Sequence, residues 1–200
     1  MIVGVLRESF PRERRVALIP ALVLTLIKAR AEVLVESGAG ADAGFPDAEY
    51  EAKGARMAAR PEVFSRAEVI LMVRTPGANP TAGAKDITAL RDGQTLIGFS
   101  EPLGAHNVTK EIAARGVSLF AMELMPRITR AQSMDALSSM ATVTGYKAAL
   151  LAATELPRMF PMMMTAAGTI APSRVFVIGA GVAGLQAIAS SRRLGAKVEA

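Results

Sequence analysis

The sequence predicts an α/β protein with mostly parallel sheets, because strand-like apolar runs alternate with helical segments along the chain. Apolar residues make up 51% of the 200 residues, which is enough for a proper core. A glycine-rich turn near residue 180 joins one such run to a helix. The length allows one large domain or two small ones.

The apolar runs define the expected strands, and the segments between them define the expected helices. Helix 20–29 begins with Pro20, a residue that suits the first helical turn. The expected strands cover residues 2–6, 32–36, 68–73, 95–99 and 117–121, and the other expected helices cover residues 47–53, 81–90 and 106–114.

The composition excludes several kinds of site. The chain has no cysteine, so it offers no disulfide, no thiolate metal site and no cysteine nucleophile. With a single histidine, His106, a histidine metal cluster is excluded as well. The N-terminal MIVGVLRESF lacks the features of a secretory signal, and no uncharged apolar run reaches the roughly 18 residues of a membrane span. The net charge of +5 comes from scattered basic residues, which disfavours a nucleic-acid interface.

A Gly-x-Gly-x-x-Gly motif, the glycine loop (residues 179–184), follows the strand-like run 175–178 and opens a helix. Gly179 permits a tight turn, Gly181 lets the backbone approach a pyrophosphate, and Gly184 lets helix and strand pack closely. The start of the helix adds free N–H groups and the positive end of the helix dipole. The pattern predicts a Rossmann unit that binds a dinucleotide; the alternative is a turn that binds nothing. The predicted contacts are Gly179, Ala180, Gly181, Val182 and Gly184.

A polar segment, RITRAQSMDALSS (residues 127–139), stands between the fifth apolar run and a long apolar helix. A connection that only needed to turn would be rich in Gly, Pro and Asn, so this one is expected to hold a ligand. Asp135 can cap the helix, which is predicted to run to about residue 156. In the simpler interpretation, Asp135 only caps the helix and Arg127 only pairs with it. Arg130 is interpreted as a solvated charge.

Residues 157–172 are expected to form a connection rich in proline and methionine. For the run 162–164, three methionines, we favour packing in the core over a cofactor contact, because methionine fills irregular gaps. The acidic residue that would bind a ribose is expected about 20 residues beyond the glycine loop. The sequence stops at Ala200, and Glu199 stands too early for that role. The chain is therefore expected to be a fragment.

Four stretches together resemble the NAD(H)-binding component of proton-translocating nicotinamide nucleotide transhydrogenase. They are VGVLRESFPRERRVALIP, RITRAQSMDALSS, PMMMTAAG and GAGVAGLQAIASSRRLGA, and the resemblance extends over essentially all 200 residues. The first and last are shared with the related alanine dehydrogenases, whereas the polar segment is the element specific to the transhydrogenases. The resemblance implies two Rossmann-like domains, residues 1–126 and an incomplete NAD(H)-binding domain from residue 127 to 200.

The resemblance further implies that the polar segment lies at the nicotinamide end of bound NAD(H). Direct hydride transfer between the C4 atoms of two nicotinamides needs no general acid or base, only rings held in position. We expect an Asp–Arg pair to lock the segment, Ser138 to address the carboxamide and Gln132 to reach ribose hydroxyls. The implied catalytic residues are Arg127, Gln132, Asp135 and Ser138, and the implied cofactor contacts are Arg127, Ile128, Thr129, Gln132, Leu137 and Ser138.

The same resemblance implies partners. NADP(H) would be held on a separate subunit, and a membrane-spanning subunit would carry the protons. A homodimer is implied, located in the cytoplasm and attached to the inner membrane through the other subunits.

Two alternatives stay open, an alanine dehydrogenase-like enzyme and a non-catalytic NAD-binding module. In alanine dehydrogenases a lysine follows the third of the expected strands and a histidine the fourth. Here LMVRTP and LIGFSEP place Arg74 and Ser100 at those positions, and neither can carry a proton near neutral pH. Arg15 is interpreted as structural, and His106 as a surface residue that opens a helix.

Overall fold

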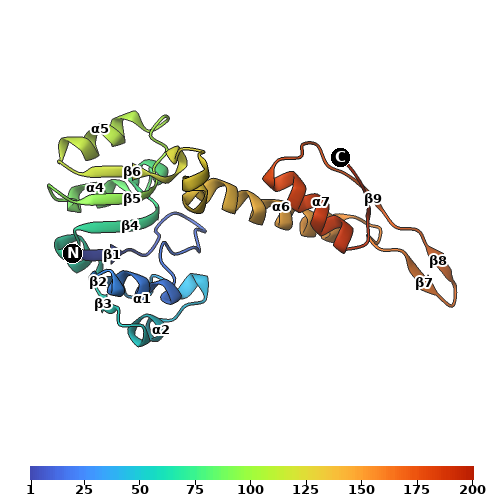
Figure 1. Cartoon of the computed structure of the whole chain (residues 1–200), viewed down its shortest axis with the longest axis horizontal. Coiled ribbons are helices and arrows are strands. Elements are labelled where there is room, and N and C mark those ends of the chain that lie inside the picture. Colours follow the sequence, from blue (N-terminus) through green and yellow to red (C-terminus); the bar gives the residue numbers. More distant parts are fainter. The chain divides into compact units, whose positions relative to one another are not determined.

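The N-terminal half of the chain is built on a six-stranded parallel sheet with the strand order β3-β2-β1-β4-β5-β6 (Figure 1). The computed structural model describes all residues from Met1 to Ala200, and they form two units, Met1–Pro126 and Arg127–Ala200. The expected parallel sheet is confirmed. The strands are β1 (Ile2–Val5), β2 (Glu32–Glu36), β3 (Arg56–Ala58), β4 (Val69–Arg74), β5 (Thr95–Phe99) and β6 (Ser118–Ala121).

One strand and one helix of this unit were not expected from the sequence. Strand β3 has only three residues, Arg-Met-Ala, and no apolar run that would mark it. Helix α3 has seven residues, of which only Val63 and Phe64 are buried, so its apolar face is too short to show a helical period. The helices of the unit are α1 (Pro20–Lys28), α2 (Asp47–Ala52), α3 (Arg60–Arg66), α4 (Ala84–Ala89) and α5 (His106–Ala114).

Both faces of the sheet are buried, as is usual when helices connect parallel strands. Alternate residues of β2 point to opposite faces, so that Leu34 joins one apolar cluster while Val33 and Val35 join another. The cluster around Leu34 includes Ile112 from α5. The second cluster includes Tyr50 from α2. The sheet is therefore the middle layer of the unit.

The second unit contains two helices that pack along each other, α6 (Ala136–Glu155) and α7 (Val182–Arg193) (Figure 1). Strands β9 (Arg174–Phe176) and β10 (Lys197–Glu199) flank α7 in sequence and pair in parallel, forming one β-α-β unit. Strands β7 (Met163–Thr165) and β8 (Gly168–Ile170) pair only with each other, in an antiparallel hairpin. None of the helices in either unit combines the length and the apolar content of a membrane crossing.

The expectation for the methionine run is wrong in this structure. Met162, Met163 and Met164 are 59%, 40% and 77% exposed rather than packed in a core. Two of them lie on β7, and a two-stranded hairpin that pairs with no other strand leaves both of its faces open. A propensity to fill gaps is of no use where no layer covers the strand.

Tyr50 provides a test of the first core. Its side chain is fully buried and its hydroxyl donates a 2.8 Å hydrogen bond to the carbonyl oxygen of Leu18. Tyr50→Phe leaves that carbonyl without its partner and should lower the free energy of unfolding by about 1 kcal/mol, as measured by urea denaturation. Tyr146→Phe removes a hydroxyl from a residue that is 51% exposed and should change nothing. Equal effects of the two substitutions would contradict this account.

Candidate functional site

The polar segment forms a short helical turn and then the first turn of α6. The 3₁₀ helix η4 (Thr129–Met134) is held to the structure by Ala131, which is 3% exposed. Around that anchor the polar side chains face outward, and Gln132 is exposed. The backbone N–H of Asp135 then donates to the carbonyl oxygen of Gln132, which closes the turn immediately before α6 begins.

Asp135 is the N-cap residue of α6, as the sequence predicts. Its Oδ1 accepts from the backbone N–H of Ser138 at 3.0 Å, and its Oδ2 accepts from the Ser138 hydroxyl at 2.7 Å. The hydroxyl hydrogen bond is the main reason why the pKa of Asp135 is lowered from its ordinary value. The backbone N–H of Ser138 lowers that pKa further, as does the charge of Arg127. Asp135 therefore stays ionised and holds Ser138 in one orientation.

The expected pairing of Asp135 with Arg127 is not what the structure contains. All ion pairs of the structure lie in the first unit, and Arg127 acts on Asp135 only as a nearby charge. The reason is the spacing of the cap, since the residue three positions after an N-cap offers its N–H directly. Arg127 and Arg130 are both exposed, as are Ile128, Thr129 and Leu137.

The glycine loop has the backbone that a pyrophosphate site requires. Gly179 has a φ of +97°, a conformation that favours glycine, and a Cβ on Gly184 would lie 1.9 Å from the carbonyl oxygen of Gly179. A Cβ on Gly181 would meet no protein atom within 4 Å. Close packing therefore explains the glycine at position 184, whereas the space beside Gly181 is free for a ligand.

The N-terminus of α7 suits an anion. Gly181 is its N-cap, no side chain bonds to the N–H groups of the first turn, and that turn contains no acidic residue. The last turn carries Arg192 and Arg193, which balance the opposite end of the helix dipole. The residues present thus fit the pyrophosphate of NAD(H), with Gly181 and the following N–H groups as the holding atoms.

A residue with no role predicted from the sequence connects the two halves of the site. Gly145 of α6 is buried, and a Cβ there would lie 2.1 Å from the carbonyl oxygen of Ala183 in the first turn of α7. The two helices therefore touch through their backbones. A glycine in the interior of a predicted helix is itself a signal of such close packing.

Comparison with known proteins assigns the chain to a family. The model of the alanine dehydrogenase/PNT N-terminal domain matches residues 4–144, and that of the C-terminal domain of the same family matches residues 148–200. The chain belongs to the alanine dehydrogenase/PNT family. The boundary between the two family models falls within α6, whereas the two compact units meet at residue 127.

Relatives within the family have two kinds of name. An NAD(P) transhydrogenase subunit alpha of Rhodospirillum rubrum is 43% identical over all of this chain and 52% of its own length. An alanine dehydrogenase of Halomonas elongata is 33% identical over 99% of this chain and 52% of its own length. The crystal structure of a transhydrogenase from Sinorhizobium meliloti matches with a TM-score of 0.93 and 48% identity, over 99% of this chain and 55% of that one. The chain thus spans about half the length of these relatives.

In this family member the carboxyl edge of the first sheet is closed by its own side chains. Glu13, whose side chain is 7% exposed, accepts from Arg15 Nη2 at 2.6 Å and from Arg74 Nε at 3.2 Å. The Arg74 guanidinium also lies over the Phe10 ring, 4.2 Å from its centroid. The Arg15 hydrogen bond is the main reason why the pKa of Glu13 is lowered to about 2. Both arginines are therefore engaged by a carboxylate of the same chain.

Two further residues occupy the same edge. Glu8 accepts from the backbone N–H groups of Val73 and Arg74, at 2.6 and 3.1 Å, and burial raises its pKa to about 7. Ser100 is 1% exposed and its hydroxyl donates to the carbonyl oxygen of Gly98. As expected, Arg15 has structural partners, and His106 is an exposed residue at the start of α5.

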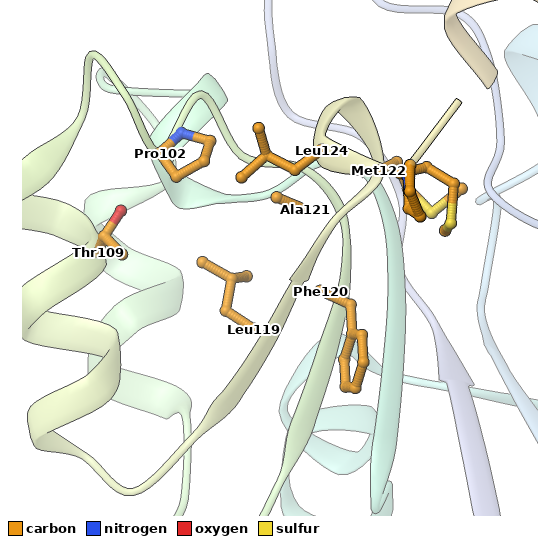
Figure 2. A pocket seen from close by; sticks show the side chains of 9 residues that line it. Pro102, Thr109, Leu119, Phe120, Ala121, Met122 and Leu124 are labelled. Carbon is orange, nitrogen blue, oxygen red and sulfur yellow. The ribbon is translucent and has the colours of Figure 1, made fainter. Parts of the chain in front are cut away.

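Two cavities of the first unit contain none of the candidate residues. One, of about 360 Å³, lies beside the edge strand β6, where Leu119 and Leu124 project toward it and Thr109 of α5 lines its other side (Figure 2). The other, of about 410 Å³, lies beside Arg60 and Lys85. Arg60 there is bonded to Asp86 and Glu36, so its charge is already satisfied.

Glu13 allows a test by pH. Because its pKa falls from 4.5 to about 2 on folding, its stabilising contribution is complete above pH 4.5 and is lost as the pH falls toward 2. Glu13→Gln should lower the free energy of unfolding by about 1–3 kcal/mol at pH 7, and the difference from wild type should vanish near pH 2. Denaturant titrations at several pH values measure this. Glu111→Gln, at an exposed position on α5, is the control; a pH-independent difference for Glu13→Gln would refute the assignment.

Proposed function

We propose that this chain is the NAD(H)-binding component of a proton-translocating transhydrogenase. The observation that carries the proposal is the polar segment, where the ionised Asp135 holds Ser138 at the start of α6. The names of the more similar relatives, which include an NAD(P) transhydrogenase subunit alpha at 43% identity, support it.

The reaction proposed is direct hydride transfer. Bound NADH would give the hydride on its C4 atom to the C4 atom of NADP⁺ on a partner subunit, leaving NAD⁺ here and NADPH there. No proton is exchanged with this chain in that step, so its residues have only to bind, orient and exclude water. The absence of a cysteine and the presence of a single, exposed histidine are compatible with a site that positions rings rather than shuttles protons.

Each residue of the site then has a definite task. The Ser138 hydroxyl proton points to Asp135, so its oxygen offers a lone pair that can accept from the NH₂ group of a carboxamide. The amide of Gln132 is exposed and can both donate to and accept from ribose hydroxyls. Arg127 supplies positive charge near the cofactor, while Ile128, Thr129 and Leu137 contribute the wall of the nicotinamide pocket. The glycine loop holds the pyrophosphate through its backbone.

The partners belong to the same proposal. A chain that binds NAD(H) needs an NADP(H)-binding subunit as hydride acceptor, and coupling to protons needs a membrane-spanning subunit. The relatives' description as "subunit alpha" favours such an assembly. A homodimer, placed in the cytoplasm and attached to the inner membrane through these partners, completes the proposal.

An alanine dehydrogenase-like activity is the second candidate, because a relative with that name is 33% identical. The first unit argues against it. Arg15 and Arg74 are bonded to Glu13, and Ser100 is buried, so that edge of the sheet offers neither a free cation nor a proton carrier. NADH formation from NAD⁺ and L-alanine by the full-length protein alone would favour this candidate. A module that binds NADH but transfers no hydride to any partner is the third possibility.

Stopped-flow measurement of hydride transfer to an NADP⁺ analogue, with the partner subunit present, tests the site residues. Gln132→Asn and Arg127→Ala should each slow transfer by about 10- to 100-fold, since both disturb how the nicotinamide is held. Arg130→Ala removes a neighbouring exposed charge of the same kind as Arg127 and should leave the rate unchanged. Undiminished rates in both site variants would refute the assignment.

A further inference from the structure

The two helices of the second unit approach most closely at a single glycine. A Cβ on Gly145 would lie 2.1 Å from the carbonyl oxygen of Ala183 and 2.9 Å from its carbonyl carbon. Both atoms belong to the backbone, so they cannot rotate away as the end of a side chain could. Any side chain at position 145 must therefore push the two helices apart.

The contact lies at a sensitive point of α7. Ala183 follows Gly181 and Val182 directly, in the turn whose free N–H groups are proposed to hold the pyrophosphate. The glycine loop is bonded into this turn as well, because the N–H of Leu185 donates to the carbonyl oxygen of Gly181 at 2.8 Å. A shift of Ala183 would consequently move the pyrophosphate site with it.

The same helix α6 carries the other end of the site. Ser138 stands seven residues before Gly145 in α6, which corresponds to about 10 Å along the helix axis. The residues between them are continuously helical. The contact at Gly145 is therefore the fixed point between the glycine loop and the start of α6.

We propose that Gly145 is a positioning residue for hydride transfer, and that its backbone contact with Ala183 sets the spacing between the pyrophosphate and nicotinamide halves of the NAD(H) site. This inference rests on the proposed function. Weaker helix formation cannot mimic it, since alanine favours a helix more than glycine does. Gly145→Ala is thus expected to strengthen α6 as an isolated helix while it disturbs the packing.

The test separates the two halves of the cofactor. In the full-length protein we would measure the affinity for ADP, which needs only the adenine and pyrophosphate half, the affinity for NADH, and the rate of hydride transfer with the NADP(H)-binding partner. Gly145→Ala should leave the ADP affinity within about twofold of wild type. It should slow transfer by about 10- to 100-fold and weaken NADH binding relative to ADP. Ala148→Ser, which adds one heavy atom at an exposed position of α6, is the matched control.

Every outcome is decisive. Wild-type transfer and NADH binding in Gly145→Ala would overturn the proposal. Equal losses of ADP and NADH binding would also overturn it, because they would indicate only a damaged fold. Should Gly145→Ala fail to fold, Ala149→Ser crowds the same face one turn further on, where Ala149 is 4% exposed, and should produce the same separation in milder form. If the wild type binds NADH but transfers no hydride, the proposed function fails, and the ratio of ADP to NADH affinity still tests Gly145.

Discussion

The carboxylate of Asp135, which accepts from both the N–H and the hydroxyl of Ser138, is the interaction on which the candidate site depends. It satisfies a backbone donor at the start of α6 and also determines where the Ser138 hydroxyl proton points. The structural interpretation, a helix cap, and the functional one, a site residue, are therefore compatible. The cap supplies the rigidity, and the rigid hydroxyl is what a positioned nicotinamide requires.

The two units treat the carboxyl ends of their strands differently. The first has the strand order of dinucleotide-binding domains, in which a ligand binds where the order reverses beside β1. There the carboxylate of Glu8, three residues after β1, is bonded to the end of β4. Glu13 engages the two nearby arginines. In the second unit the corresponding turn carries glycines and leaves its N–H groups free. The same type of fold is thus closed in one unit and open in the other.

Much of this was predictable because it depends on local patterns. The parallel strands with apolar runs, the capping role of Asp135 and the tight turn at Gly179 each follow from residues close together in sequence. What could not be predicted depends on tertiary context. Strand β3 and helix α3 are too short to show a period, and the methionines of β7 are exposed because no layer covers their hairpin. The contact of Gly145 with Ala183 joins residues 38 positions apart, and the cap geometry directed Asp135 to Ser138 instead of Arg127.

A double-mutant cycle on the rate of hydride transfer tests the central claim most directly. Asp135→Asn preserves an oxygen that can cap α6, but its NH₂ group would donate to the Ser138 oxygen and occupy the lone pair that the carboxamide needs. Ser138→Ala removes that oxygen altogether. If Asp135 acts by orienting Ser138, the double variant should be no slower than Ser138→Ala alone. Losses that multiply in the double variant would contradict the account, because they would mean that the two residues act independently.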